Sequence, residues 1–193
     1  FNFLWGGISG VFNSDVPSDV TTHGSFFVMA HFHYTIMGGL IFAWFAGIYY
    51  WVPKMYGVKL NETLAKVHFW LMFIAFNSTF GPLFGLGFMG MPRRVVTYPS
   101  YFQGLNDWVS VSAYVLGISM LIFLFNVIWS LVFKREPAEV NPWHSKSIEW
   151  ELPTPVPLHN FDEIPVFGPD PYPYGVEPAR VPTGAPAAAE GGS

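Results

Sequence analysis

Cysteine is absent from this 193-residue chain, and charged residues make up only 11% of it. Without thiols the chain forms neither disulfides nor thiolate metal sites, although this does not identify its cellular compartment. A soluble domain has about 25% charged residues, so the low charge content argues against a soluble protein. The N-terminal residues also lack the basic n-region of a signal peptide. Hydrophobic residues supply 51% of the chain and aromatic residues 19%, and this composition indicates a membrane protein.

The charges and prolines divide the sequence into two parts. Residues 1–135 contain four acidic and seven basic residues, whereas residues 136–193 contain nine acidic residues, two basic residues and twelve of the seventeen prolines. We predict that residues 1–135 form the transmembrane helices of an all-α membrane protein and that residues 136–193 form a mostly extended, partly disordered tail. Trp143 and Trp150 are candidates to anchor this tail locally. The net charge of −4 belongs to the tail, and it gives no reason to expect a nucleic-acid partner.

Three stretches are long and apolar enough to cross a bilayer, whose core of about 30 Å needs roughly 20 helical residues. The predicted spans are Ser25–Val52, Thr63–Phe88 and Val109–Phe133. The first is expected to end before Pro53, because the residue that precedes a proline disfavours helix. The opening residues FNFLWGGISGVF are apolar but too short to span, and they resemble the end of a fourth helix. Segments 13–24 and 90–107 are predicted loops.

Basic residues at the ends of these spans predict their orientation. Five lie on one side of the membrane: Lys54, Lys59, Lys66, Lys134 and Arg135. Two lie on the other side: Arg93 and Arg94. By the positive-inside rule, the C-terminal tail lies in the cytoplasm or its organellar equivalent.

Two histidines, His31 and His33, lie in the first span, where the stretch Phe26–Val52 has no Lys, Arg, Asp or Glu. Each helical residue turns by about 100°, so positions i and i+2 point roughly 200° apart. The two imidazoles therefore cannot chelate one metal from an unbroken helix, but they suit one axial ligand to each of two metal centres. Neutral His binds haem iron, copper and zinc. The alternative is that both histidines only hydrogen-bond neighbouring helices or line a water pocket.

Four further residues are candidates at the same end of this span. Arg93 and Arg94 run against the positive-inside trend, and their guanidinium groups suit membrane-edge carboxylates such as haem propionates. Adjacent arginines at a membrane edge also serve topology or lipid headgroups. His23, at the mouth of the span, follows Asp19 by four residues. This pair suits a divalent ion or a propionate, or it is a solvated part of the loop.

Three motifs at these spacings carry a family resemblance. AHFHY opens the first span, KLNETLAKVHF opens the second, and GMPRR follows the second. Together they resemble subunit I of the haem–copper oxygen reductases, of the cytochrome c oxidase type and its quinol-oxidase relatives. The resemblance covers about residues 1–165 and corresponds to the last three spans of the family plus the end of the span before them.

The resemblance implies roles for individual residues. His31 matches the axial ligand of the high-spin haem, where oxygen binds, and His33 matches an axial ligand of the low-spin haem. Arg93 and Arg94 match the arginine pair that holds haem propionates.

The resemblance also bears on the mouth of the first span. His23 matches the histidine beside the high-spin haem propionate and a magnesium site, and Asp19 matches a loop acid near the propionates. Gly24 stands where many members carry a further magnesium-ligating Asp, which leaves magnesium open and favours the quinol-oxidase alternative.

The implied protein is the catalytic subunit of a terminal oxidase that reduces O₂ to water with four electrons and translocates protons. Its implied cofactors are two haems, of the haem a type, and copper. The copper ligands belong to earlier helices of the family, so this chain would act only with the remaining helices of subunit I. Its implied partners are subunits II and III, cytochrome c or quinol, O₂ and membrane lipid. A bacterial plasma membrane is the expected location. A rival from another class is a multi-pass scaffold or transporter with a histidine proton relay.

Overall fold

The computed structural model describes residues 1–161, and in this part of the chain the regular structure is helical apart from two isolated β-bridges. The α-helices are α1 (Asn2–Ser14), α2 (Val16–Thr22), α3 (Phe26–Thr35), α4 (Phe42–Tyr56), α5 (Glu62–Phe88) and α6 (Gln103–Ile128). The π-helical turns are η1 (Ile36–Ile41) and η3 (Trp129–Lys134), and the 3₁₀ turns are η2 (Ser100–Phe102) and η4 (Ile148–Trp150). Both π turns continue a neighbouring α-helix without a break.

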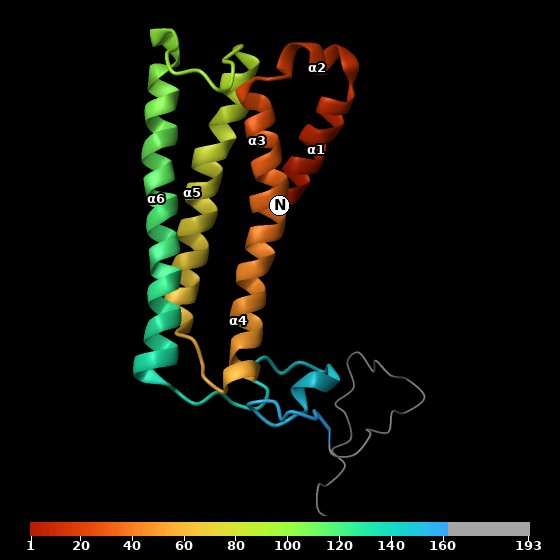
Figure 1. The fold of residues 1–193 in the computed structure, drawn as a ribbon, viewed down its shortest axis with the longest axis vertical. Helices are drawn as coiled ribbons and strands as arrows, with labels where there is room; N and C mark the ends of the chain where they lie inside the picture. The colour runs from red at the N-terminus through yellow and green to blue at the C-terminus, as the bar shows by residue number, and fades with distance from the viewer. Residues whose placement is uncertain (162–193) are drawn as a thin grey trace, which may run out of the picture.

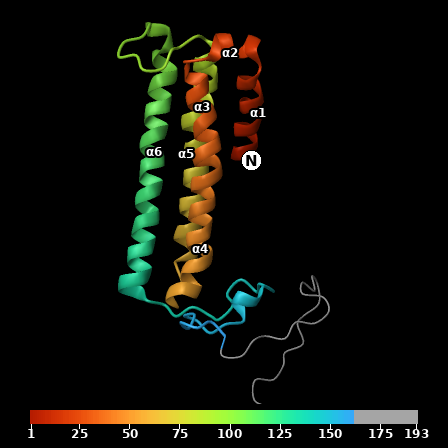
Figure 2. The same cartoon turned by 45° about the vertical axis from the view of Figure 1, so that its right-hand side comes forward.

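Three long rods stand side by side, and α1 lies against the upper part of α3 (Figures 1 and 2). Each rod is long and apolar enough to cross a membrane: Phe26–Tyr56, Glu62–Phe88 and Ser100–Lys134. The prediction of three spans plus part of a fourth helix is therefore confirmed, and the chain is a multi-pass membrane protein. We call the end of the bundle at Tyr56, Glu62 and Lys134 the tail end.

The predicted end of the first span was wrong. Helix α4 continues through Pro53 to Tyr56, and Gly57 then ends it in the left-handed conformation with φ of 67°. Proline removes one backbone hydrogen bond, but this loss falls in the last turn, where only a few residues follow. Glycine adopts positive φ without strain and is a usual helix stop.

Two predicted loops also contain helix. Within segment 13–24, the residues Val16–Thr22 form α2, with Pro17 in its first turn, where proline needs no helical partner for its missing N–H. Helix α6 begins at Gln103, six residues before the predicted start at Val109, because the polar stretch around Asn106 extends the rod beyond its apolar part. Hydropathy marks the apolar part of a rod and not its ends.

Helices α3 and α5 cross closely near their upper ends. A Cβ atom built on Gly87 of α5 would lie 2.2 Å from the backbone nitrogen of Phe27 in α3, so only glycine fits there. Further down, the Tyr34 hydroxyl donates to Asn77 Oδ1 at 2.9 Å, and Asn77 Nδ2 donates to Asn2 Oδ1 at 3.1 Å. This network joins α1, α3 and α5 by side-chain hydrogen bonds, which have little competition from water in an apolar layer.

The described part of the tail packs under the ends of the helices (Figure 1). Trp143 stacks on Tyr50 with ring centroids 6.0 Å apart, and Trp150 stacks on Trp51 at 5.7 Å. Trp150 is 1% exposed. The expected local anchoring by Trp143 and Trp150 is confirmed, and Trp150 and Leu152 are the buried residues of segment 136–161. The expected disorder near the C-terminus concerns residues outside the described part.

Lys54 holds this tail segment in place. Its side chain is 2% exposed, and its ammonium lies 5.3 Å from the ring centroid of Trp150. The ammonium donates to the carbonyl oxygens of Leu152 and Val140 and to the hydroxyl of Thr154. Three donors meet three acceptors, so the buried cation is fully hydrogen-bonded.

Replacing Lys54 with methionine is expected to loosen the tail, because the substitution keeps the apolar stem and leaves the buried carbonyl oxygen of Leu152 without its donor. An unsatisfied buried polar group costs about 1–3 kcal/mol, which corresponds to roughly a tenfold or greater rise in local opening. Hydrogen exchange of residues 140–154 in the assembled full-length protein measures this rise. Lys66→Met is the control, because the Lys66 side chain is 69% exposed. Unchanged exchange in Lys54→Met contradicts the anchoring role.

Candidate functional site

His31 is oriented by α1. Its Nδ1 lies 3.0 Å from the carbonyl oxygen of Gly6 and 2.9 Å from the hydroxyl of Ser9, which itself donates to the same carbonyl at 3.0 Å. Because a carbonyl oxygen only accepts, Nδ1 of His31 carries the proton. The close approach is possible because Gly10 has no side chain: a Cβ there would lie 3.1 Å from the His31 ring.

His33 is oriented by its own helix and by α5. Its Nδ1 lies 2.7 Å from the carbonyl oxygen of Met29, so this nitrogen also carries the proton. The ring stacks on Phe80 of α5, with centroids 4.0 Å apart and planes 16° apart. The two imidazoles therefore face different neighbours, α1 and α5, from the single helix α3.

Both Nε2 atoms keep their lone pairs available. Within residues 1–161 neither Nε2 atom has a hydrogen-bond partner. Neither is fully buried, since neither is among the buried side-chain nitrogen and oxygen atoms that lack a partner. A histidine that donates through Nδ1 presents a neutral Nε2, which is the form that binds metals. No group of three His, Cys, Asp or Glu side chains that could hold one ion occurs in the described part. The donor set thus fits two separate single-ligand positions and not a shared chelate.

Arg93 and Arg94 lie on a loop that is bonded to the start of α3. The Arg93 N–H donates to the carbonyl of Gly24 at 3.0 Å, and the Phe26 N–H donates to the carbonyl of Met91 at 3.0 Å. Arg94 has a left-handed φ of 66°. In the described part of the chain neither guanidinium has an ion-pair partner among the carboxylates. Both are therefore available to an external anion above the histidine helix.

His23 and Asp19 come together at the end of α2. His23 Nδ1 lies 3.4 Å from Asp19 Oδ2, and the two side chains are 74% and 39% exposed. They form a solvated pair and supply only two donors.

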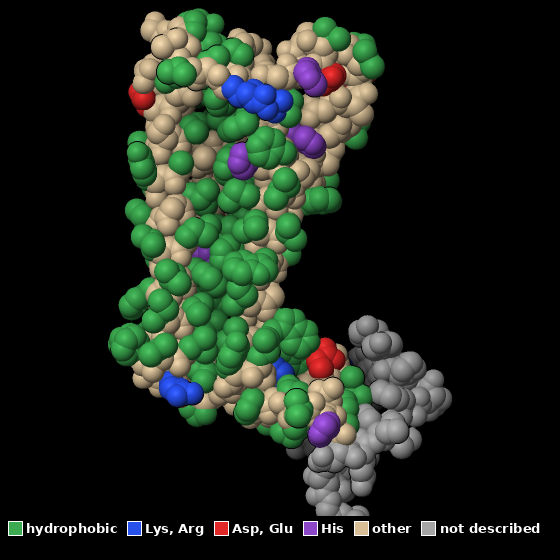
Figure 3. Space-filling view, viewed as in Figure 1, with side chains coloured by type: hydrophobic (Ala, Val, Ile, Leu, Met, Phe, Trp, Pro, Cys, Tyr) green, Lys and Arg blue, Asp and Glu red, His purple; other side chains and the backbone are tan. Residues whose placement is uncertain are grey.

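The candidate residues gather at one end of the molecule. Figure 3 shows a basic patch over the upper ends of α3 and α5, with histidine side chains reaching the surface below and beside it. His31 and His33 lie five and seven residues beyond Phe26, which places them about 7–11 Å along the helix from its start. Sequence reasoning brought these residues to the same end, but it missed Gly6, Ser9 and Phe80. The only sequence signal for them was small residues in the first helix and an aromatic in α5.

The fold and the site define a multi-pass helical membrane protein that offers two separate histidine donors from one membrane helix. A solved structure shares this fold: a haem–copper terminal oxidase dimer, determined by cryo-EM, matches with a TM-score of 0.58 and 23% identity over 75% of this chain and 28% of that one. The family model described as cytochrome c and quinol oxidase polypeptide I matches residues 1–115. The chain belongs to this family.

Curated relatives carry names from the same family. Cytochrome c oxidase subunit 1 of Synechocystis sp. is 46% identical over 176 residues, which cover 91% of this chain and 32% of the relative. The subunit 1 of Thermostichus vulcanus is 43% identical over 175 residues, with 91% and 32% covered. That of Alkalihalophilus pseudofirmus is 44% identical over 167 residues, with 84% and 26% covered. The chain therefore spans about a third of the length of the first relatives it matches.

Proposed function

We propose that the chain is the C-terminal part of the catalytic subunit of a terminal respiratory oxidase of the cytochrome c oxidase type. Such an oxidoreductase transfers four electrons to O₂, forms water and translocates protons. The observation that supports this most directly is the pair His31 and His33 on opposite sides of one membrane helix, each with its Nδ1 proton engaged and its Nε2 open. The identity of 43–46% to subunits named cytochrome c oxidase subunit 1 supports the same reading.

In this proposal Nε2 of His31 would hold the high-spin haem, where oxygen would bind, and Nε2 of His33 would hold the low-spin haem. When bound, haem supplies the electron-transfer and oxygen chemistry. The chain's own contribution is orientation and basicity. The Gly6 and Met29 carbonyls accept the Nδ1 protons, which fixes each tautomer and makes the opposite nitrogen a better donor.

We propose that the guanidinium groups of Arg93 and Arg94 bind the haem propionates. Both guanidinium groups lack a partner in residues 1–161, and their loop is tied to the start of the histidine helix. Forked guanidinium groups bind carboxylates in bidentate fashion. The exposed pair His23 and Asp19 is assigned to the outer rim of the same site. Two exposed donors and Gly24 do not make a magnesium site from the described part of this chain alone.

The remaining parts of the site belong to protein outside this chain. We propose that earlier helices of subunit I supply the copper ligands and that subunits II and III complete the enzyme. We also propose a bacterial cell membrane as the location, with the tail end on the cytoplasmic side, because five of seven basic residues of 1–135 lie at that end. In this proposal residues 1–135 form the membrane part, and residues 136–193 form the tail on the cytoplasmic side.

Oxygen consumption by the purified, fully assembled enzyme tests this function. We expect two haems per full-length subunit, of the haem a type, and oxygen uptake driven by reduced cytochrome c. Quinol oxidase is the second candidate, because the description of the matching family includes quinol oxidases. Uptake driven by quinol alone selects that rival. An assembled enzyme without haem absorbance contradicts both oxidase candidates and favours a histidine proton relay. Against such a relay, no hydrogen bond joins the rings of His31 and His33 in the described part.

A further inference from the structure

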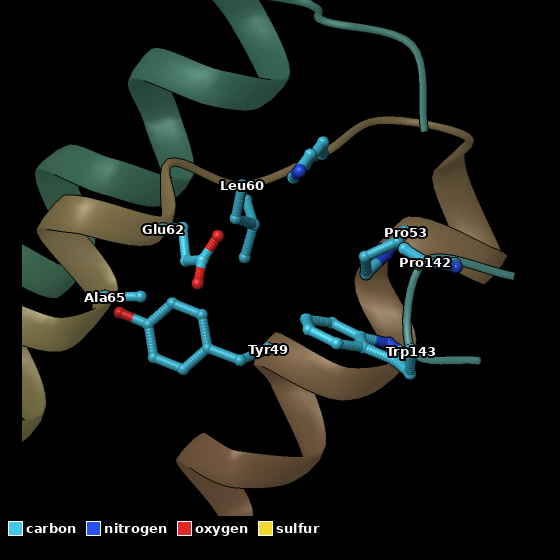
Figure 4. A pocket seen from close by; sticks show the side chains of 8 residues that line it. Tyr49, Pro53, Leu60, Glu62, Ala65, Pro142 and Trp143 are labelled. Carbon is cyan, nitrogen blue, oxygen red and sulfur yellow. The ribbon is translucent and has the colours of Figure 1, made fainter. Parts of the chain in front are cut away.

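A cavity of about 320 Å³ lies at the tail end of the bundle, between α4, the start of α5 and the docked tail. This volume is at the lower limit of ordinary small-molecule sites, which run from about 300 to 1,000 Å³. In Figure 4 the rings of Tyr49 and Trp143 border the space, with Leu60 and Ala65 on the α5 side. The walls are therefore mainly apolar and aromatic, with two charged residues, Lys59 and Glu62, in the lining.

The cavity lies where the membrane ends. The span that contains α4 ends at Tyr56, and the span of α5 begins at Glu62. Aromatic side chains concentrate at this level of a membrane protein because their rings suit the boundary between acyl chains and headgroups. Apolar walls at this level suit lipid acyl chains, and the charged residues suit the level of the lipid phosphates.

Within residues 1–161, the charges at the cavity leave Lys59 without an ion pair. Glu62 is paired with Lys66 at 2.8 Å, and Glu136 is paired with Lys134 at 2.8 Å. The hydrogen bond from Lys134 lowers the pKa of the Glu136 carboxyl, so this residue stays ionised in its pair. Lys59 lies near both carboxylates, but among residues 1–161 it has no ion pair of its own. An anion at the cavity would complete the charge balance.

The wall supplied by the tail is held in position. Trp143 Nε1 donates to the carbonyl oxygen of Tyr50 at 3.1 Å, and the two rings stack. Lys54 ties the following segment to the end of α4 through the carbonyls of Val140 and Leu152. The cavity is thus formed by two rigid helix ends and a docked segment, and not by a loose surface groove.

We propose that this cavity binds an anionic glycerophospholipid, with the phosphate at Lys59 and an acyl chain between Tyr49 and Trp143. A phosphodiester without an added ammonium group complements the charge of Lys59, whereas a zwitterionic headgroup brings a second cation beside it. This site does not depend on the haem assignments, because it lies at the opposite end of the bundle from the histidines of α3.

Binding of labelled lipid to the delipidated, fully assembled enzyme tests the proposal. The probes are spin-labelled phosphatidylglycerol and phosphatidylcholine in detergent, followed by electron paramagnetic resonance. We expect the wild type to prefer phosphatidylglycerol by about fivefold, the effect of roughly one lysine near a lipid phosphate. Lys59→Gln is expected to remove this preference. Arg135→Gln is expected to retain it, because Arg135 is a cation at the same end that does not line the cavity.

A second variant tests the apolar part of the site. Ala65→Phe places a ring in the cavity from α5 and is expected to lower the binding of both lipids. If this variant fails to assemble, the comparison of Lys59→Gln with Arg135→Gln decides alone. Wild-type binding without a phosphatidylglycerol preference, or an unchanged preference in Lys59→Gln, overturns the proposal. Lys59-dependent binding of inorganic phosphate without lipid binding also overturns it, since the cavity would then be a site for small anions.

Discussion

Replacing His33 with alanine in the full-length, assembled oxidase is expected to abolish the low-spin haem spectrum and to spare carbon monoxide binding at the other haem. The two effects separate because the rings of His33 and His31 face different helices, α5 and α1. Loss of a partner of a metal ligand already lowers metal affinity by about 10–100-fold, and loss of the ligand itself is expected to exceed this range. Optical spectra of the reduced enzyme with and without carbon monoxide measure both signals.

A histidine elsewhere in the membrane part serves as the matched control for this experiment. The His68 ring packs on Phe45 with centroids 4.9 Å apart, and its Nδ1 lies 3.2 Å from the Tyr49 hydroxyl, near the tail end. His68→Gln is expected to retain both haem signals. Survival of the low-spin spectrum in His33→Ala shows that the assignment of His33 is wrong.

Replacing His31 with alanine is expected to give the converse result. Carbon monoxide binding and oxygen uptake are lost by more than about a hundredfold, again because a ligand matters more than the group that orients it, while the low-spin spectrum persists. Ser9→Ala provides the graded comparison. It removes one acceptor of the His31 Nδ1 proton but leaves the Gly6 carbonyl at 3.0 Å. We therefore expect Ser9→Ala to lower oxygen uptake by about tenfold or less.

The relative effects of His31→Ala and Ser9→Ala on oxygen uptake show whether His31 is a metal ligand or only packs against α1. If His31→Ala and Ser9→Ala have equal effects, His31 acts through its contact with α1 and not as a ligand. If both haem signals disappear together in His31→Ala and in His33→Ala, the helix has lost its structure and the separate assignments are not supported. Two opposite spectral losses are the result expected from the geometry of α3.

Hydropathy and spacing predicted much of the fold. A run without charge from Phe26 to Val52 must lie in an apolar layer, and the rotation of 100° per residue alone sends His31 and His33 to different sides. The helix ends were predicted less well, at Pro53 and before Val109, because helix formation there depends on the neighbouring turn and not on apolarity. Helix α2 was missed because its seven residues have no apolar periodicity.

Lys54 shows where sequence reasoning reached its limit. By sequence it is one of five basic residues that set the orientation, and such residues are usually solvated. In the structure it is 2% exposed and bonded to residues 86 to 100 positions later in the chain. A contact over that separation depends on how the tail folds back on α4, and no local pattern encodes it.

The sequence by itself determined the membrane class, the three spans, the opposed directions of the two imidazoles and the nearness of the arginine pair to their helix. These features follow from composition and from the regular geometry of one helix. Only the tertiary structure decided which nitrogen of His31 stays open, since Gly6 and Ser9 lie more than 20 residues before it. It also decided that the tail closes a cavity at the opposite end. Such features require segments distant in sequence to meet, and that meeting depends on packing.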